Sequence, residues 1–163
     1  MPKLDIQDEH RLYLGFLEDV VKNIERLDIL ECHFGNCACE VIALNSKSMH
    51  ELNRTYMSKD STTDVLSFPL AGNFDFDNLG ILQDSHMLCH TIGSIAINYE
   101  LAKTVAAKLG HSEQEEITLL FIHGLLHILG YDHERDNGEQ RALEQKIIES
   151  LGLGKSLIVR SDM

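Results

Sequence analysis

Apolar residues recur at helix and strand spacings along most of the chain. In residues 8–27 they stand at positions 12, 16, 20, 24 and 27 with charged residues between them, which predicts an amphipathic helix. Short runs of apolar and β-branched residues predict three strands, at residues 38–45, 63–70 and 91–98. Capping residues and glycines predict further helices, at residues 46–57, 98–108 and 138–151.

The segment 117–129 has a different pattern, because it is apolar on nearly every side apart from its histidines. Such a segment predicts a helix buried at the centre of the domain. Ser112 and Glu115 have the spacing of a capping box that would start this helix. Strands in the first two-thirds and helices at both ends predict an α+β fold, in which a small sheet backs the central helix. At this length we expect one domain over residues 1–163, with a mobile tail at 152–163.

Candidate chemistry is concentrated at residues 123–133, which read H-x-x-x-H-x-x-G-x-x-H. His123 and His127 are one helical turn apart, so their imidazoles project from the same face. Gly130 can adopt the left-handed conformation that ends a helix, and the chain can then return His133 to the same ion. Three neutral histidines predict one Zn²⁺ with a fourth position open for a reactive water, the expected nucleophile.

One position separates this motif from that of zinc proteases, because Gly124 stands where those enzymes carry a glutamate base. Glycine cannot pass a proton to a leaving amine, whereas a phosphodiester mainly needs positive charge for its oxygens. The motif therefore favours phosphoryl chemistry, and Gly124 can let the helix approach another element or the substrate. Asp132 has three possible roles: a hydrogen bond to a ligating histidine, a cap on the turn, or proton transfer.

Charge and composition narrow the class of protein. The net charge is −12 and the pI is about 5.0, which argues against general nucleic-acid affinity and predicts that any RNA binding is selective, metal-assisted or dependent on an assembly. Arg54 and Lys59 flank the end of the predicted second helix, where they form either a solvated face or cations for a phosphate near the metal. Neither a signal peptide nor a membrane span is evident, so we expect a cytoplasmic protein without a membrane partner.

Other clusters have weaker patterns. His86 and His90 are four residues apart, but in an extended segment they would be too distant to share one ion. Asp75 and Asp77 fall in a predicted turn region at 71–84 and lack the rest of a calcium loop. The four cysteines form no C-x-x-C pair and are expected to be free thiols. A second metal site is the less favoured alternative for one group: Cys32, His33, Cys37 and Cys39.

Two motifs together resemble a known family. The string His-Gly-Leu-Leu-His-Ile-Leu-Gly-Tyr-Asp-His at 123–133 and the string Thr-Asp-Val-Leu-Ser-Phe-Pro at 63–69 are similar to those of the YbeY family of ribosomal RNA maturation endoribonucleases. The similarity extends over residues 52–152. It implies a zincin-like α+β fold with a small mixed sheet and surrounding helices. It also implies zinc ligation by His123, His127 and His133.

The resemblance further implies a zinc-dependent endoribonuclease specific for single-stranded RNA. Its expected partners are ribosomal RNA and the small ribosomal subunit, in 3′-end maturation and ribosome quality control. Two positions depart from the family pattern. Met57 stands where the family usually has a phosphate-binding arginine, which Arg54 or Lys59 could replace, and Gly93-Ser94 stands where it often has glycine-aspartate.

Two alternatives remain open from the residues alone. A metallopeptidase could draw its base from outside the motif, and its peptide cleavage would stop on chelation. A non-catalytic module stabilised by zinc could bind the ribosome and leave RNA uncut. The open fourth metal position favours catalysis over a purely structural zinc.

Overall fold

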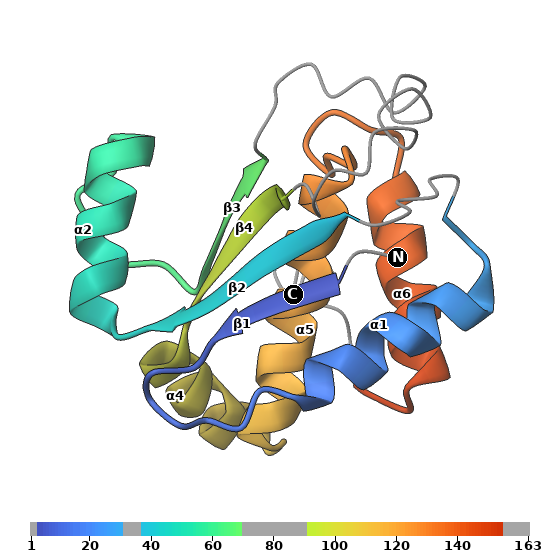
Figure 1. Cartoon of the computed structure of the whole chain (residues 1–163), viewed down its shortest axis with the longest axis horizontal. Helices are drawn as coiled ribbons and strands as arrows, with labels where there is room; N and C mark the ends of the chain where they lie inside the picture. Colours follow the sequence, from blue (N-terminus) through green and yellow to red (C-terminus); the bar gives the residue numbers. More distant parts are fainter. Residues whose placement is uncertain (1–2, 31–36, 70–90, 155–163) are drawn as a thin grey trace, which may run out of the picture.

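The computed structural model describes residues 3–30, 37–69 and 91–154. Its strands form one four-stranded sheet in the order β1-β2-β4-β3 (Figure 1). The strands are β1 (Lys3–Gln7), β2 (Ala38–Leu44), β3 (Val65–Pro69) and β4 (Thr91–Asn98). The pairs β1·β2 and β2·β4 are parallel, whereas β3 runs antiparallel to β4 at one edge. The mixed sheet is therefore confirmed.

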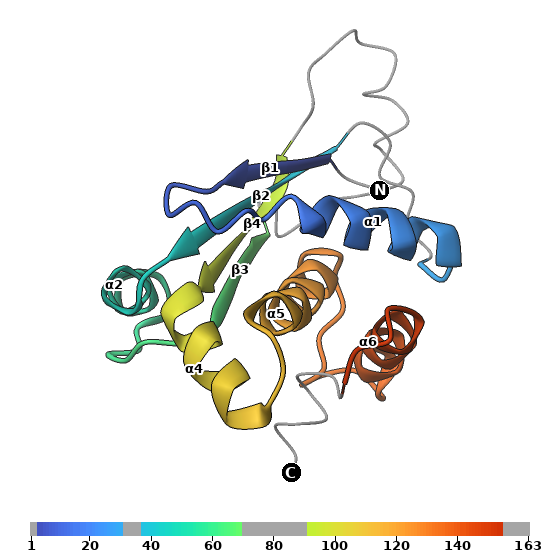
Figure 2. The same ribbon diagram turned by 90° about the horizontal axis from the view of Figure 1, so that it is seen from below.

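Helices cover both faces of this sheet. They are α1 (Phe16–Leu27), α2 (Ser46–Met57), α4 (Tyr99–Leu109), α5 (Glu113–Ile128) and α6 (Glu139–Ser150). The central helix α5 lies against one face, with α1, α4 and α6 around it (Figure 2). On the other face, Met49 of α2 packs with Leu66 and Ala96 in a smaller apolar cluster.

The alternation of side chains along β4 explains these two layers. Ile95 and Ile97 belong to the main core that includes α5, whereas Ala96 between them belongs to the α2 cluster. Every residue of β4 except Thr91 and Ser94 is buried. As predicted, α5 is central, and eleven of its sixteen residues are buried, so hydrophobic burial fixes its position against the sheet.

The predicted helix starts are confirmed by side-chain caps. The Asn45 side chain accepts a hydrogen bond from the Ser48 N–H at 2.8 Å, and the Asn98 side chain accepts one from Leu101 N–H at 3.1 Å. Ser112 and Glu115 form the predicted reciprocal capping box. Gly110, with φ of 75°, ends α4 in the left-handed conformation that a glycine adopts without strain.

The N-terminal segment differs from the prediction. The helix expected over residues 8–27 begins only at Phe16, because the Asp8 carboxylate accepts hydrogen bonds from Leu12 N–H and Leu14 N–H in a turn. Arg11 and Tyr13 have φ values of 52° and 56°, which no α-helix tolerates. The unpredicted strand β1 comes before this turn, so the described part of the chain starts with a strand where the sequence predicted only a helix.

Several sequence predictions lie outside the described residues, namely the turn region 71–84, the end of the strand at residue 70 and the tail beyond 154. Within the described ranges, no helix combines the length and hydropathy needed to span a lipid bilayer.

Candidate metal centre and cleft

The end of α5 brings three histidines together. His123 and His127 lie on α5, and the chain reverses after it at Gly130, which has φ of 96° and donates its N–H to the His127 carbonyl at 3.0 Å. Tyr131 N–H then bonds the Leu126 carbonyl at 3.0 Å, so the next residues return along the helix end. One ring nitrogen from each of His123, His127 and His133 lies within 4.8 Å of the others.

The donor atoms fit a small divalent cation. The Nε2 atoms of His123 and His127 are 3.1 Å apart, close to the distance of about 3.3 Å between two ligands of a tetrahedral ion with bonds of about 2.0 Å. Burial lowers the pKa of His127, and the neighbouring His123 and His133 lower it further. The neutral imidazole, the form that binds metals, is thus favoured near neutral pH.

A carboxylate that the sequence did not suggest contacts this cluster. Glu144 of α6 is fully buried, and its Oε2 lies 3.2 Å from Nδ1 of His123. The adjacent turn contains Asp132, whose Oδ1 accepts a hydrogen bond from Glu134 N–H at 3.0 Å and whose Oδ2 lies 3.5 Å from Arg135 Nε. These contacts are those of a turn cap, one of the three roles that the sequence left open.

Gly124 is positioned by packing against the sheet. A Cβ atom there would lie 2.9 Å from Ile95 Cγ2 and 3.0 Å from Ser67 Oγ. The Ser67 hydroxyl donates a hydrogen bond to the Gly124 carbonyl at 3.1 Å. Of the two roles considered for this glycine, close approach to another structural element is therefore the one observed. A side chain that extends beyond a Cβ atom at this position would have to displace β3 or β4.

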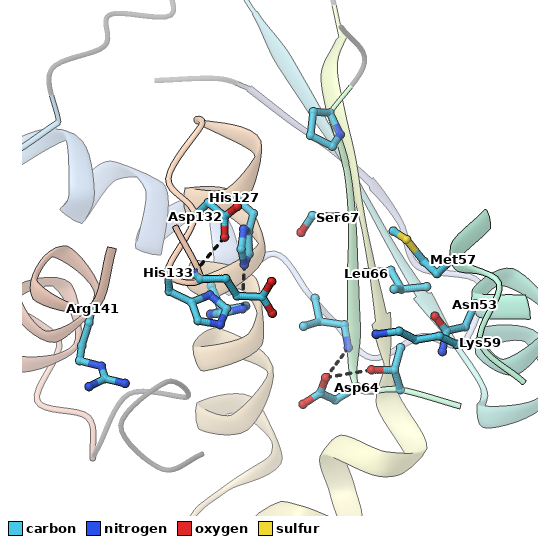
Figure 3. Close-up of a pocket in the computed structure, with 15 residues that line it drawn as sticks. Asn53, Met57, Lys59, Asp64, Leu66, Ser67, His127, Asp132, His133 and Arg141 are labelled. Atoms are coloured by element: carbon cyan, nitrogen blue, oxygen red, sulfur yellow. Dashed lines mark hydrogen bonds between the residues drawn. The ribbon is translucent and has the colours of Figure 1, made fainter. Parts of the chain in front are cut away.

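A cleft of about 630 Å³ opens beside the histidines (Figure 3). We call its two sides the metal wall and the strand wall. The metal wall comprises His123, His127, Asp132, His133, Glu134 and Arg141. The strand wall comprises Asn53, Met57, Lys59 and residues of the 63–69 segment. Lys59 borders the cleft, Arg54 is not among the lining residues, and Arg141 is a lining cation that the sequence did not suggest.

Buried asparagines hold the strand wall in place. The Asn53 side chain donates to the Ser61 carbonyl at 2.8 Å, and the backbone carbonyl of Asn53 accepts from Lys59 N–H at 3.3 Å. Ser58 adopts φ of 56°, which turns the chain at the end of α2 toward the cleft. Asn98, fully buried, donates to the Thr63 carbonyl at 3.1 Å. The segment that carries Lys59 is therefore anchored at both ends.

The charges along the cleft have opposite signs. Among the described lining residues, Lys59 and Arg141 are cationic, whereas Asp64, Asp132 and Glu134 are acidic. The lining alone is therefore slightly negative, and a divalent cation at the histidines would make it positive. This balance favours metal-assisted binding, one of the three ways in which so acidic a protein was expected to bind RNA.

Rival sites receive no support within the described ranges, where the histidine trio is the only metal-compatible cluster found. Cys37 and Cys39 are buried in the core, and burial together with the nearby Glu40 charge raises the pKa of Cys39 to about 12. Several candidate ligands lie outside the described residues: Cys32, His33, Asp75, Asp77, His86, Cys89 and His90.

Comparison with known proteins identifies the family. The family model described as Endoribonuclease YbeY matches residues 5–152. This chain belongs to the YbeY family. It is 53% identical over 161 residues to Endoribonuclease YbeY of Helicobacter hepaticus, a match that spans 99% of this chain and 97% of the relative. It is 47% identical over 140 residues to Endoribonuclease YbeY of Campylobacter jejuni strain 81-176, spanning 84% of this chain and 95% of the relative.

A solution structure of TM1509 from Thermotoga maritima has the same fold. It superposes with a TM-score of 0.59 over 93% of this chain and 89% of the other, at 23% sequence identity. In this YbeY chain, Met57 lines the cleft and is 41% exposed. Ser94 instead pairs with Phe68 in the β3·β4 ladder and is not among the lining residues. Only the first of the two departures from the family pattern therefore changes the cleft surface.

Proposed function

We propose that this protein is a zinc-dependent endoribonuclease that cuts single-stranded RNA in the cleft beside His123, His127 and His133. The observation that carries the proposal is the convergence of three imidazole nitrogens at the edge of a cleft, in a chain of the YbeY endoribonuclease family. These three residues would hold one zinc ion. When bound, the ion supplies positive charge that stabilises the negative charge building up on phosphate oxygens during cleavage.

The protein's own side chains would bind and orient the RNA. Lys59 on the strand wall and Arg141 on the metal wall offer cations on opposite sides of the cleft, where they can contact phosphates on either side of the scissile bond. Asp64 faces the same cleft, and its Oδ1 is fixed by a hydrogen bond from Val65 N–H at 2.8 Å. Its carboxylate is thereby held at a constant position opposite the histidines (Figure 3).

The proposed substrate is ribosomal RNA in the small ribosomal subunit, in maturation of the 3′ end and in ribosome quality control in the cytoplasm. The family name supports an RNA substrate. The net charge of −12 supports presentation of the RNA by an assembly, because the protein has little general attraction for a polyanion. We also propose that residues 1–163 form one hydrolase domain.

The metallopeptidase alternative loses support at Gly124. The glutamate that zinc proteases carry at this position would collide with Ile95 and Ser67. The third alternative, a zinc-stabilised module that binds RNA without cutting it, makes a distinct prediction that a cleavage assay tests directly.

The decisive variant is His123→Ala. It should lower cleavage of a single-stranded RNA by the zinc-loaded protein at least about 100-fold, the scale on which loss of a main charge stabiliser acts. His10→Ala is the matched control, because His10 packs against Tyr99 and is not among the residues that line the cleft, so this variant should keep full activity. Full activity of His123→Ala would refute the site. RNA that the wild-type protein binds with zinc but leaves uncut would favour the binding module instead.

A further inference from the structure

The inward face of α6 has an unusual composition. Its buried residues are Gln140, Glu144, Ile147 and Ile148, which follow the spacing of an ordinary amphipathic helix. The first two are polar, yet both have 0% exposed surface. A buried glutamate and a buried glutamine one turn apart need polar partners, because removal from water is unfavourable without them.

Both partners belong to the metal wall. Gln140 accepts a hydrogen bond from the backbone N–H of His133 at 2.8 Å and donates its amide to the His123 carbonyl at 3.5 Å. Glu144 contacts His123 Nδ1 through Oε2. The first two turns of α6 thus place polar side chains where an amphipathic helix would normally bury apolar ones. These side chains contact two of the three histidines, His123 and His133.

The Glu144 contact decides which nitrogen of His123 is free. A carboxylate can only accept a hydrogen bond, so Nδ1 of His123 carries the hydrogen and Nε2 keeps its lone pair. That same Nε2 faces His127 Nε2 at 3.1 Å. The contact therefore fixes both the tautomer and the ring orientation that metal ligation requires.

Only one of the two carboxylate oxygens of Glu144 has a hydrogen-bond partner among the described residues. Its second oxygen, Oε1, is buried and has no hydrogen-bond partner among them. A buried carboxylate in this condition is unfavourable by itself and becomes favourable when positive charge lies close to it. A cation on the far nitrogen of the His123 ring would supply that charge through the imidazole.

We propose that Glu144 is a positioning residue for the metal centre, which orients His123 and offsets the charge of the bound ion, and that Gln140 holds the backbone of His133 for the same purpose. The inference rests on the proposed function only in taking His123 as a metal ligand. It separates the roles of α6, since Ile147 and Ile148 anchor the helix in the core whereas its first two turns serve the metal centre.

The test compares Glu144→Gln and Glu144→Leu in the full chain, with Glu149→Gln on the exposed face of the same helix as the control. Zinc affinity is measured by competition with a chromophoric chelator, and melting temperature is measured with and without zinc. We expect zinc to bind about 10-fold more weakly to Glu144→Gln, which keeps an acceptor oxygen, and about 100-fold more weakly to Glu144→Leu, the range typical of such contacts. Glu149→Gln should equal the wild type.

The melting temperatures separate positioning from a structural role. Without zinc, Glu144→Gln should melt at about the same temperature as the wild type, because glutamine keeps the size of the side chain and one acceptor oxygen. With saturating zinc it should melt lower, because weaker binding gives less stabilisation. Zinc affinity within twofold of the wild type in Glu144→Gln, or an equal fall in melting temperature with and without zinc, would overturn the proposal.

Two further outcomes need to be distinguished. If Glu144→Leu does not fold, the zinc affinity and melting temperatures of Glu144→Gln decide the question. If the wild-type protein binds no zinc, the metal site itself is refuted. This result differs from unchanged zinc affinity in the variants, which would refute only the role of Glu144. Because neither measurement involves RNA, the result does not depend on whether the protein cleaves it.

Discussion

The two walls of the cleft are built differently. On the metal wall, His123 and His127 project from a buried helix, and their surroundings are connected by hydrogen bonds to α6. On the strand wall, Met57 and Lys59 are exposed at the end of α2, and backbone hydrogen bonds with buried asparagines hold only their main chain. The metal wall thus fixes its histidine side chains, whereas at Met57 and Lys59 the strand wall fixes only the backbone.

This difference separates the chemistry from substrate recognition. The sequence motif of the metal wall keeps all three histidines, whereas the strand wall has Met57 in place of the arginine that the family resemblance implies. An exposed side chain at the end of a helix can change without disturbing the core, and a neighbouring cation such as Lys59 can assume its role. We therefore expect substitutions on the metal wall to alter metal binding or stability, and those on the strand wall to alter RNA affinity.

The largest loss of stability should come from a substitution at Gly124, where α5 of the metal wall packs against the sheet that carries the strand wall. Gly124→Ala would place a Cβ atom 2.9 Å from Ile95 and 3.0 Å from Ser67. We expect the free energy of unfolding to fall by about 2 kcal/mol, because overpacking outweighs the better helix propensity of alanine. Chemical denaturation of the zinc-free protein measures this loss.

Gly15→Ala is the control for that substitution, since a Cβ atom at Gly15 would meet nothing within 4 Å. Its stability should stay within about 0.5 kcal/mol of the wild type. An equally stable Gly124→Ala variant would mean that α5 and β3 can separate easily and that the metal wall is less rigid than its packing indicates.

A smaller effect is expected on the strand wall. Lys59→Ala should lower kcat/KM for single-stranded RNA about tenfold, or about 1.4 kcal/mol, through a higher KM. Loss of one phosphate contact should also reduce the dependence of log affinity on log salt concentration by about one unit. Binding titrations at several salt concentrations, together with steady-state kinetics, measure both quantities.

Arg54→Ala is the matched control, because Arg54 is an exposed cation in the last turn of α2, five residues before Lys59, but does not line the cleft. It should leave the salt dependence unchanged. The reciprocal variant Met57→Arg should strengthen RNA binding by adding a cation to the lining. If Arg54→Ala and Lys59→Ala weakened binding equally, RNA would follow the outer surface of α2 instead of the cleft.

The smallest effect should appear in the pH dependence of stability. The pKa of His127 lies below its ordinary value of 6.5, mainly because of burial and then because of His123 and His133. As the pH falls through 6.5, the unfolded chain takes up a proton before the folded protein does, so stability decreases until folded His127 is also protonated. Denaturation of the zinc-free protein at pH 7.5 and 5.5 should show this decrease, and His127→Gln should reduce it.

Local patterns predicted much of this molecule. The capping box at Ser112, the left-handed Gly130 and the one-turn spacing of His123 and His127 each depend on a few neighbouring residues, which the chain shows directly. The same holds for the caps at Asn45 and Asn98. The apolar run at 117–129 predicted the central position of α5, and the two motifs predicted family membership; both are confirmed. The mixed sheet is confirmed as well, but it was implied only by the family resemblance.

What the sequence could not show depends on distant contacts. Strand β1 has only five residues with alternate exposure, and its position follows from pairing with β2 more than thirty residues later. The late start of α1 depends on the Asp8 side chain, which competes with the helix for backbone N–H groups. Glu144 lies 21 residues after His123. A buried polar pair in the apolar stripe of α6 was the available signal for that contact.

The proposed ligands are all imidazoles, and the one described thiol with a raised pKa, Cys39, lies sealed in the core. Oxidants attack thiolates much more readily than thiols or imidazoles, and zinc sites built from cysteine lose their metal when those sulfurs are oxidised. A centre without sulfur donors does not lose its ion by this route. If these histidines hold zinc as proposed, peroxide stress would leave the ion in place when sulfur-ligated zinc proteins lose theirs.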